Sequence, residues 1–287
     1  MSSKLVCGTA WRGPSANDTM SLPTTLRVLQ ITDPHMTARA GEEIHGNDPY
    51  RALTRVLDAA LADPSPPELL IATGDLSADE SPASYERMRE LLLRTGLPCL
   101  VLPGNHDSAE EMRRSLVGGL IQSSRVHDFP DWRFVLLDST VEGEYFGRLE
   151  ASELAALTDA LESAGRRRVV VALHHGPLRP CPSPDCHLRN GDELMERLRS
   201  SPAARVVLAG HAHLELEQQL DHVLCLTCPS SNSQAIHAQL GAPVDHDDFY
   251  ASHTLDPSRH AYRMLSLGPG DAVHTEVIYL NALEEIA

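Results

Sequence analysis

The stretch Leu26-Arg-Val-Leu-Gln-Ile-Thr-Asp-Pro-His35 joins a short apolar run to two residues of types that commonly bind metals. Leu26 to Ile31 predicts a buried strand, because short apolar runs of this length are typical of sheets covered on both faces. Asp33 and His35 follow at once, and in an extended segment residues two apart project to the same side. The stretch therefore predicts a strand that presents two ligand-type side chains to one point.

Five further apolar runs predict buried strands, and four amphipathic stretches between them predict helices. The strands are expected at Glu68 to Thr73, Cys99 to Leu102, Phe134 to Leu137, Val169 to Leu173 and Arg205 to Ala209. The helices are expected at Tyr50 to Leu61, Tyr85 to Leu93, Leu154 to Leu161 and Glu193 to Leu198. Alternation of this kind indicates an α/β fold, in which sheets are covered by helices.

The pattern changes after the run that ends at Ala209. His222 to Thr227 predicts one more strand, and two apolar runs around Gly268-Pro-Gly-Asp271 predict a β-hairpin over residues 261–280. Residues 238–259 have little periodicity. We expect one domain over residues 26–287, with 238–287 as a C-terminal cap and hairpin region, preceded by a flexible N-terminal extension over residues 1–25.

Composition narrows the classes of function. The chain has 287 residues, of which 42% are hydrophobic, so it can bury a large core. Its formal net charge of -16 argues against binding a nucleic-acid polymer, which requires basic surface. No run is long and apolar enough to span a bilayer, and the N-terminus lacks the apolar centre of a secretory signal, so we expect a cytoplasmic protein. The six cysteines, Cys225-x-x-Cys228 included, are expected to be ordinary thiols.

Ligand-type residues follow the predicted strands at five places. These are Asp33-Pro-His35, Gly74-Asp75, Gly104-Asn-His-Asp107, His174-His175 and Gly210-His-Ala-His213. Ligands of open α/β sheets gather at the carboxyl ends of strands, so these segments are expected to meet. A single buried His or a Gly-Asp pair is usually a core residue or a turn, but five such segments in one structural position favour a metal site. Oxygen and imidazole donors without thiolate suit iron, manganese, zinc or cobalt better than calcium or copper(I).

In their order along the chain, the five motifs resemble the motif set of the calcineurin-like metallophosphoesterases. The resemblance runs from about Leu26 to Pro229 and implies a four-layer α/β (α+β) fold, a sandwich of two mixed β-sheets flanked by helices. It also implies two divalent metal ions per chain, with iron and manganese expected and zinc or cobalt as alternatives. One ion would be held by Asp33, His35, Asp75 and His213, and the other by Asp75, Asn105, His174 and His211, with Asp75 bridging.

The pair His174-His175 leaves two candidates for one ligand position. His174 directly follows the predicted strand, and the ligand in the family usually stands two residues before a Pro or a small residue. His174 is therefore the expected ligand, and His175 is expected to support it or to belong to the core. Gly176 stands where the family more usually has Pro, which leaves the ligand positions intact but affects the nearby substrate wall.

Further segments resemble the bacterial class III cyclic nucleotide phosphodiesterases. They are Ile31 to His35, Ala72 to Ser77, Leu102 to Asp107, Gly147 to Leu149, Leu188 to Asn190 and Cys228 to Ser231. The resemblance implies hydrolysis of a phosphodiester, 3′,5′-cyclic AMP or a related cyclic nucleotide, by attack of a metal-bridging hydroxide. The alternatives are a glycerophosphodiesterase or an unselective phosphoesterase, a phosphomonoesterase, and a non-catalytic interaction module on the same fold.

His106 and Asp107 are the expected catalytic residues. His106 follows the predicted ligand Asn105 and is not expected to reach the same metal, so it can face the substrate and stabilise the transition state or protonate the leaving alkoxide. Asp107 is expected to orient it, or to cap a helix that starts near Ser108. A small phosphodiester is the expected partner, and no association with a membrane is expected. Residues 238–259 are either a solvated loop or a cap or homodimer contact, and the resemblance favours the second.

Overall fold

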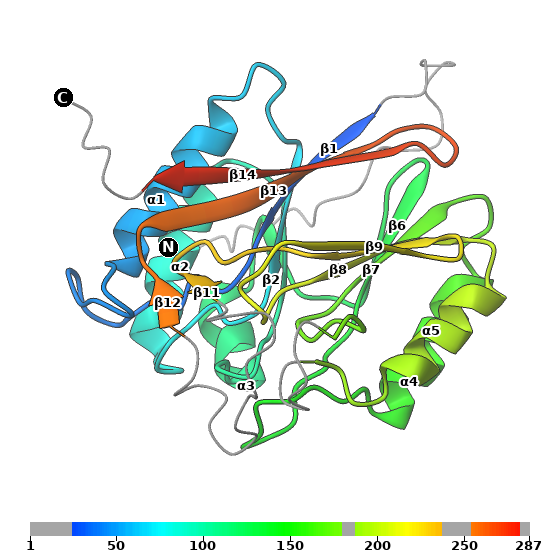
Figure 1. The fold of residues 1–287 in the computed structure, drawn as a ribbon, viewed down its shortest axis with the longest axis horizontal. Helices are drawn as coiled ribbons and strands as arrows, with labels where there is room; N and C mark the ends of the chain where they lie inside the picture. The colour runs from blue at the N-terminus through cyan, green and yellow to red at the C-terminus, as the bar shows by residue number, and fades with distance from the viewer. Residues whose placement is uncertain (1–24, 180–186, 237–253, 282–287) are drawn as a thin grey trace, which may run out of the picture.

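Two six-stranded mixed sheets pack face to face, with helices on their outer faces (Figure 1). The computed structural model describes residues 25–179, 187–236 and 254–281. The predicted sandwich flanked by helices is confirmed. All but the last residue of the predicted N-terminal extension, and most of the irregular segment 238–259, lie outside the described residues.

The first sheet has the strand order β14-β13-β1-β2-β3-β4. Its strands are β1 (Leu26–Ile31), β2 (Leu69–Thr73), β3 (Cys99–Leu102), β4 (Ile121–Gln122), β13 (Arg259–Leu267) and β14 (Val273–Asn281). β1 to β4 run parallel to one another, whereas β13 pairs antiparallel with both β1 and β14. The predicted C-terminal hairpin is therefore found, and it extends the first sheet.

The second sheet has the order β5-β6-β7-β8-β10-β9. Its strands are β5 (Val126–Asp128), β6 (Trp132–Leu136), β7 (Arg168–Ala172), β8 (Ala204–Ala209), β9 (Leu216–Leu220) and β10 (Val223–Thr227). β6, β7, β8 and β10 are parallel, and the two edge strands are antiparallel. A separate small sheet pairs β11 (Gln234–Ile236) with β12 (Thr254–Asp256).

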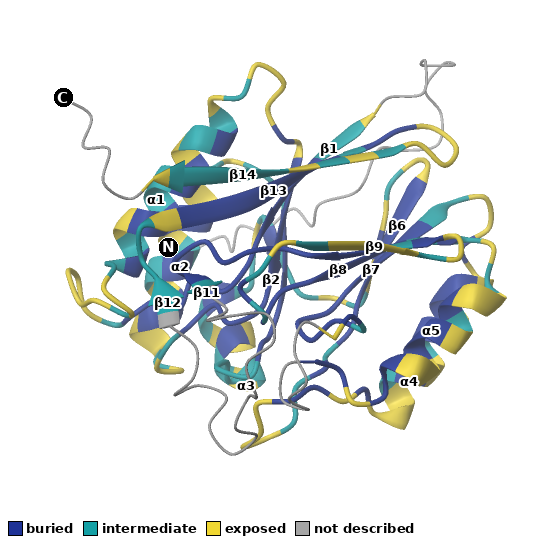
Figure 2. Cartoon of the chain, in the orientation of Figure 1, coloured by how far each residue is buried: buried dark blue, intermediate teal, exposed yellow. Residues whose placement is uncertain are grey.

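Helices α1 (Pro49–Leu61) and α2 (Pro82–Arg94) cover the first sheet, and α4 (Ala151–Glu162) and α5 (Gly191–Ser200) cover the second. Each helix turns its apolar residues to the sheet and its charged residues to solvent (Figure 2). The Asp48 side chain caps α1 by accepting from the backbone N–H of Tyr50 and Arg51. Of the helices in the described ranges, none combines the length and apolar character that crossing a bilayer requires.

The core consists of three apolar layers. Val28, Ile71, Phe134, Val170 and Leu208 belong to the layer between the two sheets. The other two layers lie between each sheet and its helices. Every residue of β2, β3 and β6 is buried. The parallel strands are thus fixed on both faces, and their carboxyl ends form a rigid platform for the segments that follow them.

Candidate active site

The five ligand-type segments follow the carboxyl ends of β1, β2 and β3 in the first sheet and of β7 and β8 in the second. Backbone hydrogen bonds link neighbouring segments: Asp33 N–H donates to Gly74 O (3.0 Å) and His35 N–H to Asp75 O (3.0 Å). In the second sheet, Gly210 N–H donates to His174 O (3.0 Å). The segments predicted to meet are therefore brought together at one end of the sandwich, from both sheets.

The backbone at this end is strained at the predicted ligands. Five of them have a left-handed backbone: Asp33 (φ 51°), His35 (φ 49°), Asp75 (φ 51°), His211 (φ 67°) and His213 (φ 51°). Each non-glycine residue in this region costs on the order of 1 kcal/mol or more. Such conformations persist only where the surrounding structure enforces them, and they concentrate at functional sites.

Two glycines allow the close approach of these segments. A Cβ on Gly104 would overlap the carboxylate and backbone of Asp75, and a Cβ on Gly74 would overlap the His174 ring. Gly74 also has φ +94°, a backbone region that L side chains rarely adopt. The glycine before Asp75 and the one before Asn105 are thus required by contact with the site itself.

Asp33, His35 and His213 form a first group of ligand-type side chains. The Nε2 atom of His213 lies 3.2 Å from Asp33 Oδ1 and 3.4 Å from His35 Nε2. Nδ1 of His213 donates to Ser233 O (2.8 Å), which leaves the Nε2 lone pair facing the group. Asp33 Oδ2 accepts from Thr32 Oγ1 (2.5 Å) and from the backbone N–H of His211.

Asp33 Oδ1 is the atom of this group that lacks a protein donor. It is completely buried and makes no hydrogen bond of normal geometry. A buried carboxylate oxygen without a partner is costly, since its desolvation is not compensated. A cation bound between this oxygen and the imidazoles would satisfy it.

Asp75, Asn105 and His174 form a second group beside the first. His174 Nε2 lies 3.3 Å from Asp75 Oδ2 and 3.2 Å from Asn105 Oδ1. Asp75 Oδ1 accepts from the backbone N–H of His106 (2.9 Å), whereas Oδ2 also lies 3.8 Å from His35 Nε2. The Oδ2 atom of Asp75 therefore lies between the two groups, and Asp33 Oδ1 also approaches the second group, 3.9 Å from His174 Nε2.

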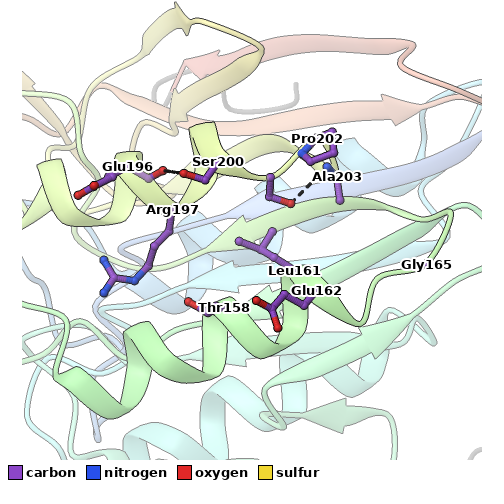
Figure 3. Close-up of a pocket in the computed structure, with 10 residues that line it drawn as sticks. Thr158, Leu161, Glu162, Gly165, Glu196, Arg197, Ser200, Pro202 and Ala203 are labelled. Carbon is purple, nitrogen blue, oxygen red and sulfur yellow. Dashed lines mark hydrogen bonds between the residues drawn. The ribbon is translucent and has the colours of Figure 1, made fainter.

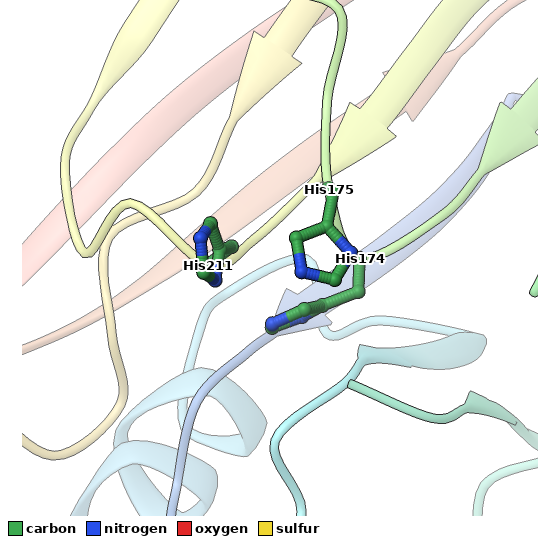
Figure 4. Close-up of side chains that lie close together, drawn as sticks. All are labelled: His174, His175 and His211. Atoms are coloured by element: carbon green, nitrogen blue, oxygen red, sulfur yellow. The ribbon is translucent and has the colours of Figure 1, made fainter. Parts of the chain in front are cut away.

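His175 lies in the same place, so three imidazole rings gather after β7 and β8 (Figure 4). The ring centres of His175 and His211 are 4.4 Å apart. Both ring nitrogens of His175 have other partners, however. Nε2 donates to Tyr145 O (3.0 Å), and Nδ1 lies 2.9 Å from Ser139 Oγ. Nε2 of His174 faces Asp75 Oδ2 and Asn105 Oδ1, whereas Nε2 of His175, also 3.2 Å from Asn105 Oδ1, is engaged by Tyr145 O, so His174 remains the predicted ligand.

Opposite charges lie close together in this buried cluster. Burial would raise the pKa of Asp33, yet the facing His213 lowers it below its usual value. Burial likewise opposes protonation of His174, but the carboxylate of Asp75 outweighs it and raises the pKa of His174 to about 9. Burial lowers the pKa of His35 to about 3. The two carboxylates thus remain ionised and attract positive charge, which protons or metal cations can supply.

The two predicted catalytic residues occupy different positions. The ring of His106 is half-buried and its centre lies 5.2 Å from that of His35, at the edge of the cluster. Asp107 instead accepts hydrogen bonds from the protein frame, from Gly104 N, Leu76 N, Ser77 N and Tyr85 Oη at 2.9–3.0 Å. Burial and the charge of Asp75 raise the pKa of Asp107 to about 7. Asp107 is therefore placed to hold the segments after β2 and β3 together.

Several residues of the site were not foreseen from the sequence. Thr73 and Ser233 act through their carbonyl oxygens, which no side-chain pattern reveals. His45 lies on the segment between β1 and α1 with its ring centre 6.3 Å from that of His35, and Tyr145 lies 6.0 Å from His106 by the same measure. A His or Tyr in an irregular segment carries no periodic signal.

A pocket lies between α4 and α5 (Figure 3). Leu161, Glu162, Glu196 and Arg197 line it together with residues 200–203, which precede β8. It therefore lies near the amino ends of β7 and β8, at the opposite end of the strands from the ligand-type residues. None of the predicted site residues lines it.

Comparison with known proteins places the chain in a family. Residues 26–215 match the calcineurin-like phosphoesterase family model. The chain belongs to this family, as its five motifs predicted, and it is a hydrolase of phosphate esters. The donor set described above, carboxylate oxygen and imidazole nitrogen, fits the divalent ions that such enzymes use.

Curated relatives are similar over most of the chain. A 3′,5′-cyclic adenosine monophosphate phosphodiesterase CpdA from Pseudomonas aeruginosa is 33% identical, over 91% of this chain and 92% of that protein. The CpdA of Escherichia coli K12 is also 33% identical, over 88% and 89%. A 3′,5′-cyclic-nucleotide phosphodiesterase of Nostoc is 31% identical, over 72% and 78%.

Solved structures share the fold at low identity. A dimetal phosphatase from Danio rerio has a TM-score of 0.59 and 17% identity, over 90% of this chain and 99% of that one. GAP50 of Plasmodium, described as the anchor in the inner membrane complex, has a TM-score of 0.62 and 11% identity, over 91% and 86%. These likenesses concern the fold alone.

Proposed function

We propose that the chain is a phosphodiesterase that hydrolyses 3′,5′-cyclic AMP or a closely related cyclic nucleotide at two divalent metal ions. The observation that carries this proposal is the position of Asp75 Oδ2, within 3.3 Å of His174 Nε2 and 3.8 Å of His35 Nε2, between two groups of buried ligand atoms. The names of the relatives from Pseudomonas and Escherichia support the choice of substrate.

The metal ligands would be the seven residues that converge after the strand ends. Asp33, His35, Asp75 and His213 would hold one ion, and Asp75, Asn105, His174 and His211 the other. Divalent ions at such a site supply a water molecule of lowered pKa and neutralise charge on the phosphoryl oxygens. We propose iron or manganese as the ions, as the resemblance to the family implies, and the oxygen and imidazole donors, with no thiolate among the described ligands, suit both.

The protein must also attract an anionic substrate although its formal net charge is -16. The local charge of the metal-loaded site would account for this attraction. Two carboxylates, Asp33 and Asp75, set against two divalent cations leave a local charge of about +2. The buried surroundings screen this charge less than water would, so a phosphodiester anion is drawn to the site in spite of the overall field.

His106 is the residue proposed to move the proton. Hydrolysis adds water to phosphorus and breaks the bond to the 3′ oxygen, which must gain a proton to leave as a hydroxyl. The backbone N–H of His106 is fixed to Asp75 Oδ1, so its ring is held at the edge of the metal ligands without being one of them. A half-buried imidazole in this position can reach a substrate oxygen and can exchange its proton with solvent.

A substrate panel tests the proposal. The purified protein, reconstituted with Mn²⁺ or Fe²⁺, would be assayed with 3′,5′-cyclic AMP, 3′,5′-cyclic GMP, 2′,3′-cyclic AMP, glycerophosphoethanolamine and AMP. We expect the highest kcat/KM for a 3′,5′-cyclic nucleotide and loss of that activity in Asp75→Ala. A clear preference for glycerophosphoethanolamine or for AMP as substrate would overturn the proposed specificity while leaving the family assignment intact.

A further inference from the structure

A row of four ring side chains runs along the edge of the site. The ring centres of His45 and His35 are 6.3 Å apart, those of His35 and His106 are 5.2 Å apart, and those of His106 and Tyr145 are 6.0 Å apart. His35 belongs to the predicted metal ligands and His106 is the proposed proton donor. His45 and Tyr145 stand at the two ends of the row and have no role in the chemistry described so far.

The backbone around Tyr145 is fixed from several sides. Its carbonyl oxygen accepts from His175 Nε2 at 3.0 Å. The next side chain, Phe146, lies under the Arg189 guanidinium, whose carbon is 3.2 Å from the ring centre. Gly147 O accepts from the backbone N–H of Arg189 at 2.8 Å, and a Cβ on Gly147 would overlap the His175 ring. The position of Tyr145 beside the site is therefore set by the same residues that pack against the ligands.

The side chain of Tyr145 is nevertheless 48% exposed. Within the described residues, the other large hydrophobic side chains that are exposed are Leu93 on α2 and Val126 on the edge strand β5. A half-exposed aromatic side chain whose backbone is fixed at the edge of a catalytic site offers surface to a planar group of a bound ligand.

We propose that Tyr145 stacks on the nucleobase of the substrate and so gives the site its preference for nucleotides. This inference rests on the proposed function. In a cyclic nucleotide the base is carried by the sugar, and His106 is assigned to the 3′ oxygen of that sugar. Tyr145 lies beyond His106 in the row, so a phosphate at the metal ligands and a sugar at His106 bring the base to Tyr145.

The other end of the row suits a different part of the substrate. His45 has a left-handed backbone (φ 54°), and its neighbour Asn47 anchors the segment by donating to Asn232 O (2.9 Å) and Pro257 O (3.0 Å). Its ring lies beside His35, at the metal end of the row. An imidazole there offers an N–H to a phosphate oxygen rather than a broad apolar face. A variant of His45 is therefore the control that distinguishes recognition of the base from recognition of the phosphate.

Inhibition by two ligands that differ only in the base tests the proposal. AMP and ribose 5-phosphate would be titrated as inhibitors of bis(4-nitrophenyl) phosphate hydrolysis by the metal-loaded wild type, Tyr145→Ala, Tyr145→Phe and His45→Ala. We expect Tyr145→Ala to raise the inhibition constant of AMP by about 5- to 20-fold, the lower part of the range for losing one base–aromatic stack. The inhibition constant of ribose 5-phosphate, which has no base, should change much less. Tyr145→Phe should keep the wild-type constant for AMP within about twofold, because the ring face remains.

Two results would overturn the inference. One is equal weakening of AMP and ribose 5-phosphate in Tyr145→Ala, which would show a general effect on the site. The other is selective loss of AMP binding in His45→Ala with none in Tyr145→Ala, which would put the base at the opposite end of the row. Failure of the wild type to hydrolyse any cyclic nucleotide would contradict the proposed function instead. The two failures are therefore distinguishable.

Discussion

The Nδ1 atom of His174 donates a hydrogen bond to the carbonyl oxygen of Thr73 at 2.8 Å. Thr73 is the last residue of β2 in the first sheet, whereas His174 follows β7 in the second. The bond therefore joins the two sheets at the site. Because a carbonyl can only accept, the bond keeps a proton on Nδ1 of His174 and directs Nε2 at the Asp75 and Asn105 oxygens, so Nε2 is the atom that would bind a metal ion.

This relationship predicts different results for the two adjacent histidines. His174→Ala should reduce the metal content from about two ions per chain to about one, because it removes a ligand. His175→Ala should leave about two ions bound, since both nitrogens of His175 are used by Ser139 and Tyr145. Elemental analysis of the reconstituted proteins measures both. Loss of one ion in His175→Ala with full occupancy in His174→Ala would reverse the assignment.

His106 should matter to the chemical step more than to metal binding. His106→Ala should keep its metals while kcat falls by ~10²–10⁴ for a substrate with a poor leaving group, the range expected when a general acid is lost. The loss should shrink for bis(4-nitrophenyl) phosphate, because nitrophenolate leaves without being protonated. If both kinds of substrate lose the same factor, His106 stabilises charge rather than donating a proton.

Asp107 should contribute to stability through the four donors that it accepts. Asp107→Asn replaces one carboxylate oxygen by an N–H group that faces backbone N–H groups, and we expect it to lower the free energy of unfolding by about 3 kcal/mol. Tyr85→Phe, which removes one of the four donors, should cost about 1 kcal/mol. Urea unfolding of the two variants measures the difference. Wild-type stability in Asp107→Asn, combined with a fall in kcat like that of His106→Ala, would instead assign Asp107 a direct catalytic role.

Two glycines with positive φ offer a matched pair of variants. An alanine at Gly74 (φ +94°) or at Gly96 (φ +70°) would have to adopt a positive φ, which lowers the free energy of unfolding by roughly 1–2 kcal/mol. Only at Gly74 would the new Cβ meet the His174 ring, whereas nothing lies within 4 Å of the Cβ position at Gly96. Gly74→Ala should therefore lose metal and activity, and Gly96→Ala should lose only stability. Equal metal affinity in the two variants would show that the contact at Gly74 does not shape the site.

Periodicity located the central strands well because they are buried on both faces. Two strands, Leu26–Ile31 and Cys99–Leu102, were predicted with their observed bounds. The bounds of the other predicted strands differ from the observed ones by one or two residues. The edge strands β4, β5 and β9 were missed, whereas the edge strand β14 was predicted as part of the C-terminal hairpin. Leu216–Leu220 reads Leu-Glu-Gln-Gln-Leu, and it is a strand because its backbone pairs with β10, not because its side chains are apolar.

The site was predictable in part for the same physical reason. Each ligand-type segment stands immediately after a strand whose apolar run is visible in the sequence, so Asp33, Asp75 and His211 could be placed at one edge. The ring nitrogens of His175 are engaged by partners 36 and 30 residues away along the chain, Ser139 and Tyr145, and these contacts distinguish it from His174. No local pattern specifies such contacts.

The central claim is that two metal ions share the carboxylate of Asp75, and anomalous diffraction at the manganese edge from crystals of the Mn²⁺-loaded protein tests it most directly. The account predicts two peaks, each about 2.0–2.3 Å from its ligand atoms. One peak should be bound by Asp33, His35 and His213, the other by Asn105, His174 and His211, and Asp75 should contact both. A single peak, or two peaks that do not share Asp75, would contradict it.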